Sequence, residues 1–149
     1  MIVAWDTYQT GDVPRMLDTQ MSAALVLLVA AVDGRQPAEA RQAAIDVARA
    51  GLDLELRHRP VVEIDLARFD LWARQIQVDV ATRDPGAVTG DVATLEWTWE
   101  RLRHALDDSA VMRIESELRK LRAAADAENL SKAKDAATRL RGTLGGLEL

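Results

Sequence analysis

The sequence contains no cysteine, and this absence removes several chemistries at once. Disulfide bonds, thiolate metal sites and cysteine nucleophiles all require that residue. Aromatic residues make up only 4% of the chain, and no segment shows the two-residue alternation of apolar and polar side chains that is typical of a strand. The sequence therefore predicts neither a disulfide-stapled domain nor a β-sheet.

The short motifs that accompany common catalytic sites are also missing. There is no Gly-rich phosphate loop, no G-x-S-x-G, no H-E-x-x-H and no EF-hand loop. Only two histidines occur, and neither stands beside a nucleophile in the sequence. Carboxylates are plentiful, but Asp65, Asp70 and Asp79 fall at helical positions that we expect to be solvated. We therefore expect a protein that is not an enzyme.

The charge and hydropathy of the chain argue against nucleic acid and membrane as its partners. The formal net charge of −5 argues against a general nucleic-acid binder, which needs a basic face. The longest apolar run, 21–32, is too short to cross a bilayer, so we expect a soluble protein without a membrane span. No basic segment leads into an apolar stretch at the start of the sequence, so no signal peptide is visible. Cytoplasmic location and export followed by signal removal both stay open.

The residues that are present favour helix. Alanine and leucine dominate, and sixteen arginines stand against three lysines. Ala, Leu, Arg and Glu are all strong helix formers. A length of 149 residues suits one domain, and an apolar fraction of 48% with a charged fraction of 29% is typical of a folded chain. The composition therefore predicts a single all-α domain over residues 1–149.

Proline and glycine divide the chain into helices. Helix starts are marked by Asp12 with Pro14 and by Pro37, and helix ends by Gly34 and Pro60. The turn at 84–86 separates two more helices. The predicted helices cover about 12–33, 37–59, 61–83 and 87–106, followed by a hairpin that Ser109 opens and that ends with a helix over 131–144. Four helices of about 20 residues with short loops predict an antiparallel up-down-up-down four-helix bundle over 1–108. The hairpin over 109–149 is expected to dock on it.

Two helices carry more apolar surface than one core requires. The helix over 12–33 is apolar on nearly every face, which predicts that it is the most buried element. The helix over 61–83 has a heptad stripe and also a second stripe of Ile64, Leu71 and Val78. A second stripe exceeds what one four-helix core covers, so we expect it to be free for a partner unless the hairpin over 109–149 docks on it.

One end of the predicted bundle gathers potential metal ligands. Glu55 and His58 have the Glu-x-x-His spacing that places a carboxylate and an imidazole on one helix face. His104, Glu63 and Met16 fall at the same end of the predicted bundle. This set suits iron or zinc, while copper would recruit the methionine. The phase of His104 counts against the site, because it lies off the heptad core, and a histidine in a last helical turn is also favoured by the helix dipole.

Two functional hypotheses follow. The first is a non-enzymatic helical module that binds a protein partner, or self-associates as a homo-oligomer, through an exposed apolar helix face. The alternative is a metal-binding four-helix bundle in which His58, His104, Glu55, Glu63 and Met16 hold copper, iron or zinc as the cofactor. The first hypothesis requires no cofactor.

Overall fold

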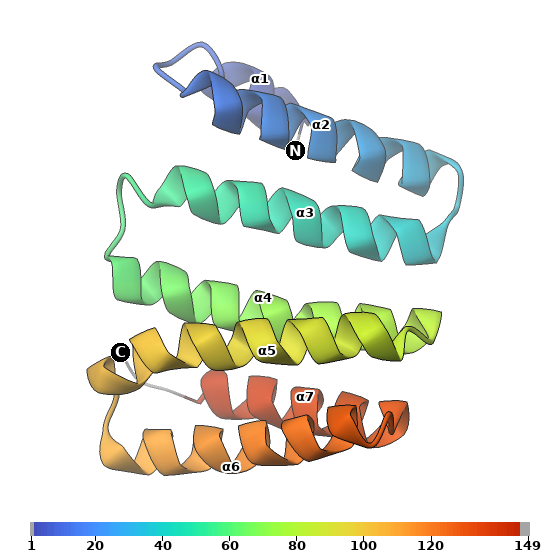
Figure 1. The fold of residues 1–149 in the computed structure, drawn as a ribbon. Helices are drawn as coiled ribbons and strands as arrows, with labels where there is room; N and C mark the ends of the chain where they lie inside the picture. The colour runs from blue at the N-terminus through green and yellow to red at the C-terminus, as the bar shows by residue number, and fades with distance from the viewer. Residues whose placement is uncertain (1, 147–149) are drawn as a thin grey trace. The chain divides into compact units, whose positions relative to one another are not determined.

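A computed structural model describes residues 2–146, and every regular element in that range is helical (Figure 1). The all-α prediction is therefore confirmed for the described residues. The long helices fall where the proline and glycine pattern placed them, within a few residues at each end. The elements in chain order are α1 (Ile2–Tyr8), α2 (Arg15–Asp33), α3 (Pro37–Glu55), α4 (Val61–Thr82), α5 (Pro85–Leu102), the 3-10 turn η1 (Arg103–Ala105), α6 (Asp108–Asp126) and α7 (Leu130–Leu144).

Side-chain caps fix several helix starts. Asp84 accepts a hydrogen bond from the backbone N–H of Ala87 at 2.9 Å and opens α5. Asp107, rather than the predicted Ser109, caps α6, since its carboxylate accepts from two backbone N–H groups of the first turn. Arg83 ends α4 in the left-handed conformation, with φ of 60°. The caps at Asp84 and Asp107 satisfy N–H groups that the first turn of a helix leaves unpaired.

The chain divides after Arg59 into two units, each with its own core. In the first unit α2 and α3 pack along one another, and α1 is attached to α2 by side-chain hydrogen bonds. The Trp5 indole N–H donates to the Ser22 hydroxyl at 3.0 Å. The buried apolar residues of this unit's cluster are few and lie on one side of α2: Trp5, Met21, Leu25, Ala50 and Leu54.

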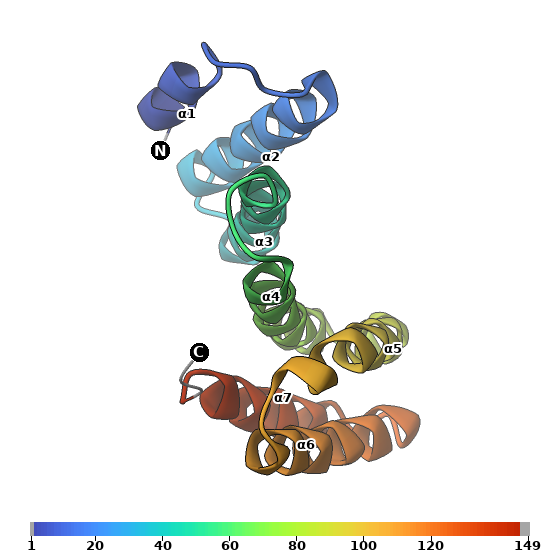
Figure 2. The ribbon, with the colours of Figure 1, turned by 90° about the vertical axis from the view of Figure 1, so that its left-hand side faces the viewer.

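In the second unit α4 contacts α5 and α7, and α6 contacts α5 and α7, so the four helices surround a common core (Figure 2). The rings of Phe69 and Trp99 meet at its centre with 5.9 Å between their centroids. The core draws on all four helices: Phe69, Ala73, Ile76, Val88, Val92, Leu95, Trp99, Leu102, Ile114, Leu118, Leu121, Ala124, Ala125, Ala133, Ala136, Ala137 and Leu140.

The helices that build this core are not the ones that we expected to build it. We expected residues 109–149 to form a hairpin docked on a core built by 1–108. In the structure α6 and α7 instead contribute nine of the residues of the α4–α7 core, and that core contains no residue of α2 or α3. The packing of all four helices of 12–106 around one core stays a prediction.

One buried charge also departs from expectation. Asp65 of α4 is only 6% exposed, whereas its position in the helix pattern suggested a solvated side chain. Its carboxylate accepts a hydrogen bond from Arg101 of α5 at 2.9 Å and lies 3.5 Å from the guanidinium of Arg68. Two arginines therefore compensate the loss of hydration that burial imposes on this carboxylate.

Candidate functional site

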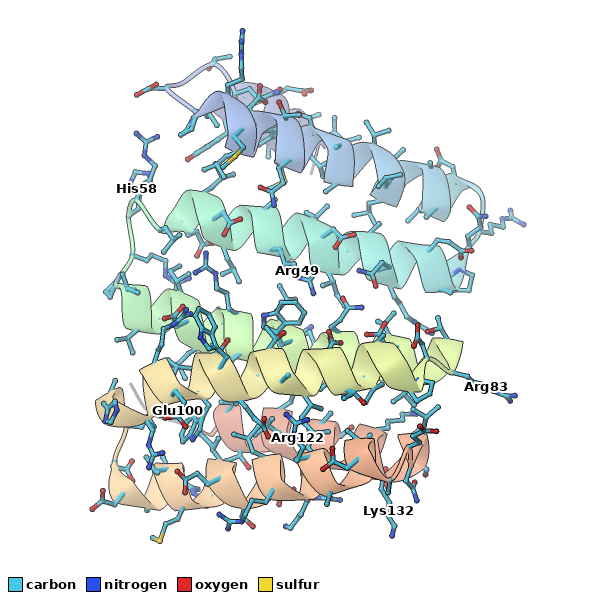
Figure 3. All side chains as sticks on the ribbon, viewed as in Figure 1. Arg49, His58, Arg83, Glu100, Arg122 and Lys132 are labelled. Atoms are coloured by element: carbon cyan, nitrogen blue, oxygen red, sulfur yellow. The ribbon has the colours of Figure 1, made fainter. Side chains whose placement is uncertain are left out.

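The residues proposed as metal ligands are spread over both units. Met16, Glu55 and His58 belong to the first unit, and Glu63 and His104 to the second. His58 lies in the exposed turn after α3 (Figure 3), and the carboxylate of Glu55 is paired with Arg59 at 2.6 Å. Among residues 2–146 no three His, Asp or Glu side chains are grouped as a metal ion needs. The arrangement of these residues therefore lends no support to the metal hypothesis.

The second apolar stripe of α4 is not the exposed surface that we expected. Ile64 is fully buried and Leu71 is 7% exposed, so the stripe is largely covered. The large exposed apolar side chains of this helix are confined to its first turn, at Val61 and Val62. The hypothesis of an exposed apolar helix face therefore needs a different helix.

That helix is α2. Although its sequence is apolar nearly all round, four of its large apolar side chains lie mostly in solvent: Met16 is 75% exposed, Val26 68%, Leu27 59% and Val32 57%. The prediction that this helix is buried on every face is thus wrong for the chain as it stands. The helix packs on α3 and α1 along one side, and its opposite side has no covering helix within its own unit.

The exposed side chains of α2 follow a regular spacing. Met16, Gln20, Ala23, Leu27 and Ala30 are all exposed and recur at alternating intervals of four and three residues. That interval is the one by which a helix presents a continuous seam to another helix. We call this seam, together with the flanking Val26, the α2 face.

A charged residue stands at each end of the α2 face. Arg15 is the first residue of the helix and Asp33 is the last. Both are exposed, and within residues 2–146 neither takes part in an ion pair or a side-chain hydrogen bond. The seam therefore carries an unpaired positive charge at one end and an unpaired negative charge at the other.

Hydropathy sets α2 apart from the other described helices. It is the one helix within residues 2–146 that is long and apolar enough to cross a membrane. Only 22% of the 18-residue apolar stretch of this helix is buried. The test is one of length and composition, which the core helix of a folded protein also passes. The described residues thus show no clear membrane span, but they do show a strongly apolar helix that is left uncovered.

A shallow hollow adjoins the α2 face where α1 lies beside α2. Its volume is about 500 Å³, and its lining is mainly apolar, with Trp5, Leu25 and Val26 among the contributors. Asp6 and Asp33 are its charged lining residues, and it has no basic one. The hollow widens the apolar surface around α2 without adding a group that does chemistry.

No protein-family model matches the chain, and neither the curated proteins nor the solved structures contain a match to it.

Proposed function

We propose that this chain is a non-enzymatic helical module that associates with protein through the α2 face, and that the occupant of this face is a second copy of the chain. The observation that carries the proposal is the exposure of Met16, Val26 and Leu27 on one side of the most apolar of the helices. Contiguous apolar surface of this kind on a folded chain is typical of an interaction site.

The end charges favour a second copy over an unrelated partner. In an antiparallel pair of α2 helices centred on the seam at Ala23, residue Arg15 of one copy lies within one helical turn of Asp33 of the other. The same pair forms again at the opposite end, because a two-fold interface repeats each contact. In this register Met16 lies opposite Ala30 and Gln20 lies opposite Leu27, so the two seams meet along their length between the charged ends.

The seam has the side chains that close helix packing requires. Ala23 and Ala30 are small and exposed, so they allow helix axes to approach within the usual 8–10 Å. Leu27 and Val26 then fill the space on either side of the crossing. A helix of 19 residues is about 28 Å long, so the seam alone buries less than the roughly 800 Å² per partner of a standard interface. We therefore expect a weak dimer, with a dissociation constant on the order of 10 μM.

The anionic character of the segment argues against the lipid bilayer as the occupant. Residues 2–33 contain four aspartates and one arginine, and the α2 face itself has no lysine. Helices that lie on membranes instead carry basic residues on their polar side, which attract anionic lipids. A bilayer is therefore an outcome that the experiment must distinguish.

Sedimentation equilibrium of the full chain between about 1 and 200 μM tests the proposal, since this range brackets the expected dissociation constant. The wild-type chain should be a dimer at the upper end. Leu27→Glu should be a monomer throughout, because it places a charge in the seam. Met112→Glu is the matched control, as Met112 is an exposed apolar residue of α6 outside the face, and it should dimerise like the wild type.

Two results would overturn the proposal. One is a wild-type chain that stays monomeric over the whole range. The other is a Leu27→Glu variant that dimerises as well as the wild type. Co-sedimentation with anionic or neutral lipid vesicles that Leu27→Glu abolishes, found with a monomeric wild type, would assign the α2 face to a membrane instead.

We also propose an antiparallel up-down-up-down topology for α4, α5, α6 and α7. The support is the contact of each of these helices with the next along the chain, together with the contact between α4 and α7. Short connections between consecutive helices favour this arrangement.

A further inference from the structure

A second hollow lies entirely within the second unit, between α5 and α6. Its volume is about 680 Å³, which is in the range of small-molecule sites. Small side chains make the hollow: Ala93 of α5 and Ala123 of α6 line it, and Leu118 and Trp99 are buried residues at its base. We call it the α5–α6 groove.

Two ion pairs cross the groove and tie its walls together. Arg122 of α6 bonds Glu96 of α5 through two guanidinium nitrogens, with one N–H···O distance of 2.9 Å. The hydrogen bonds to Glu96 raise the pKa of Arg122 above its ordinary value. About two helical turns away Arg103 lies 3.2 Å from Glu115. The walls are thus held in place on either side of the groove's middle.

The carboxylates of the groove all have an arginine partner. Glu96 and Asp126 are paired with Arg122, the second at 3.8 Å. Glu115 and Glu100 are paired with Arg103, the second at 3.7 Å. Figure 3 shows Glu100 and Arg122 in the region between the two helices. The groove therefore has no acidic group that lacks a cation.

Two groups of the groove are left without a partner, and both are hydrogen-bond donors. Arg119 is exposed, lines the groove, and forms no ion pair or hydrogen bond within residues 2–146. Trp99 is 3% exposed, and its indole N–H is buried without an acceptor among the described atoms. A buried donor without an acceptor is rare enough to require an explanation.

Trp97 adds an aromatic surface at the rim. It is 64% exposed and lines the groove. The guanidinium of Arg101 lies 4.2 Å from the centre of its ring, and Arg101 is itself held by Asp65. The Trp97 ring is thus positioned by a contact that is anchored to the core.

We infer that the α5–α6 groove binds a carboxylate attached to an apolar body, such as an aryl or alkyl carboxylic acid or the equivalent side chain of a peptide. The carboxylate pairs with the Arg119 guanidinium, whose donors suit a planar carboxylate. The apolar body lies over Leu118 and against Trp97. Trp99 lines the groove and its indole N–H has no acceptor among the described atoms, so a ligand oxygen that reaches it would supply one. This inference does not depend on the proposed function of the α2 face.

Phenylacetate is the probe for the free acid, and the indole N–H signals in a proton–nitrogen NMR titration of the full chain are the readout. The expected result is a saturable shift of the Trp99 and Trp97 signals, while those of Trp5 and Trp72 stay in place. Phenethylamine, which carries the opposite charge on the same ring, should give no saturable shift. A short peptide with a Glu-Phe pair tests the second source of the same chemistry.

Variants separate the groove from general anion attraction. Arg119→Gln should weaken phenylacetate binding by about ten-fold or more, because it removes a charged hydrogen-bond donor. Arg113→Gln is the matched control: it removes the same charge from an exposed position of α6 outside the groove, and it should leave binding unchanged. Trp99→Phe removes the indole N–H together with the pyrrole part of the ring, so it should weaken binding, and a urea titration of the variant checks that the fold is retained.

Three outcomes would overturn the inference. The first is the absence of a saturable shift with both phenylacetate and the Glu-Phe peptide up to about 10 mM, beyond which binding is too weak to be specific. The second is equal weakening by Arg119→Gln and Arg113→Gln. The third is phenethylamine binding as tightly as phenylacetate, which would assign the groove to its carboxylates.

Discussion

Exchanging the two charges at the ends of α2 tests the self-association geometry most directly. In the proposed dimer each Arg15 faces Asp33 of the second copy, so the interface contains the pair twice. An exposed ion pair contributes about 0.2–1 kcal/mol. Arg15→Asp removes two such pairs and sets like charges opposite each other, which should weaken dimerisation by about 1–3 kcal/mol, or about five- to a hundred-fold in dissociation constant. Asp33→Arg should have the same effect for the same reason.

Mixing the two single variants supplies the internal control. One copy then has aspartate at both ends of α2 and the other has arginine at both ends, so an antiparallel heterodimer regains two opposite-charge pairs. We expect each variant alone to be mainly monomeric at about 20 μM, near the expected wild-type dissociation constant, and the equimolar mixture to dimerise. The double variant Arg15→Asp with Asp33→Arg should return to within about two-fold of the wild type.

Salt dependence gives a second readout in the same assay. Raising the salt concentration from about 0.05 to 0.5 M screens exposed charges, so it should weaken the wild-type dimer and strengthen the single-variant homodimers. Single variants that dimerise as tightly as the wild type, or a mixture that behaves like its components, would refute the antiparallel register. Loss of dimerisation in Leu27→Glu together with unaffected charge variants would leave the α2 face as the interface but discard the pairing of its ends.

Other predictions concern the fold and the alternative function. Phe69→Ala should lower the free energy of unfolding by about 3–5 kcal/mol in a urea titration, because Phe69 is fully buried in the α4–α7 core. The pKa of Asp107 lies below its ordinary 3.8, chiefly because its carboxylate accepts the backbone N–H of Ala110. This carboxylate therefore stabilises the fold at higher pH, and the stabilisation is lost as the pH falls below about 4, so Asp107→Ala should show a smaller fall in melting temperature than the wild type over that range. Calorimetric titration with zinc, copper or iron(II) should give only weak binding that His58→Ala and His104→Ala leave unchanged; tight stoichiometric binding lost in either variant would restore the metal hypothesis.

Helix positions could be predicted from the sequence because their signals are local. Pro60 and the turn at Asp84 bracket a helix predicted over 61–83, and α4 spans Val61–Thr82. The helix α1 was not predicted, since it has only seven residues and its attachment depends on a hydrogen bond from Trp5 to Ser22, seventeen residues away. A short helix that is stabilised by a distant contact leaves no periodic pattern in its own segment.

Which helix sides are covered could not be predicted, because periodicity identifies an apolar side but not its neighbour. The second stripe of α4 and the outer side of α2 are equally apolar in sequence, yet Ile64 is fully buried and Val26 is 68% exposed. The same limit applies to charge: Asp65 reads as a solvated carboxylate until Arg101, on the next helix, is seen to bond it. The groove donors Arg119 and Trp99 had no signal in the sequence, since their distinguishing property is the lack of a partner in three dimensions.

Self-association would explain both the apolar sequence of α2 and the exposure of one of its sides. Its composition demands burial on nearly every side, and a single copy of the chain covers only the side that carries Met21, Ala24, Leu25 and Ala31. Exposed valine and leucine side chains each forfeit on the order of 1.5–3 kcal/mol relative to full burial. A second α2 helix laid along the seam would recover part of this free energy at Met16, Val26 and Leu27, and the opposite charges at the two ends would fix its direction. On the proposed self-association, the apolar pattern of α2 is explained by burial in a dimer, and the uncovered seam of the single chain is the part of the pattern that association would satisfy.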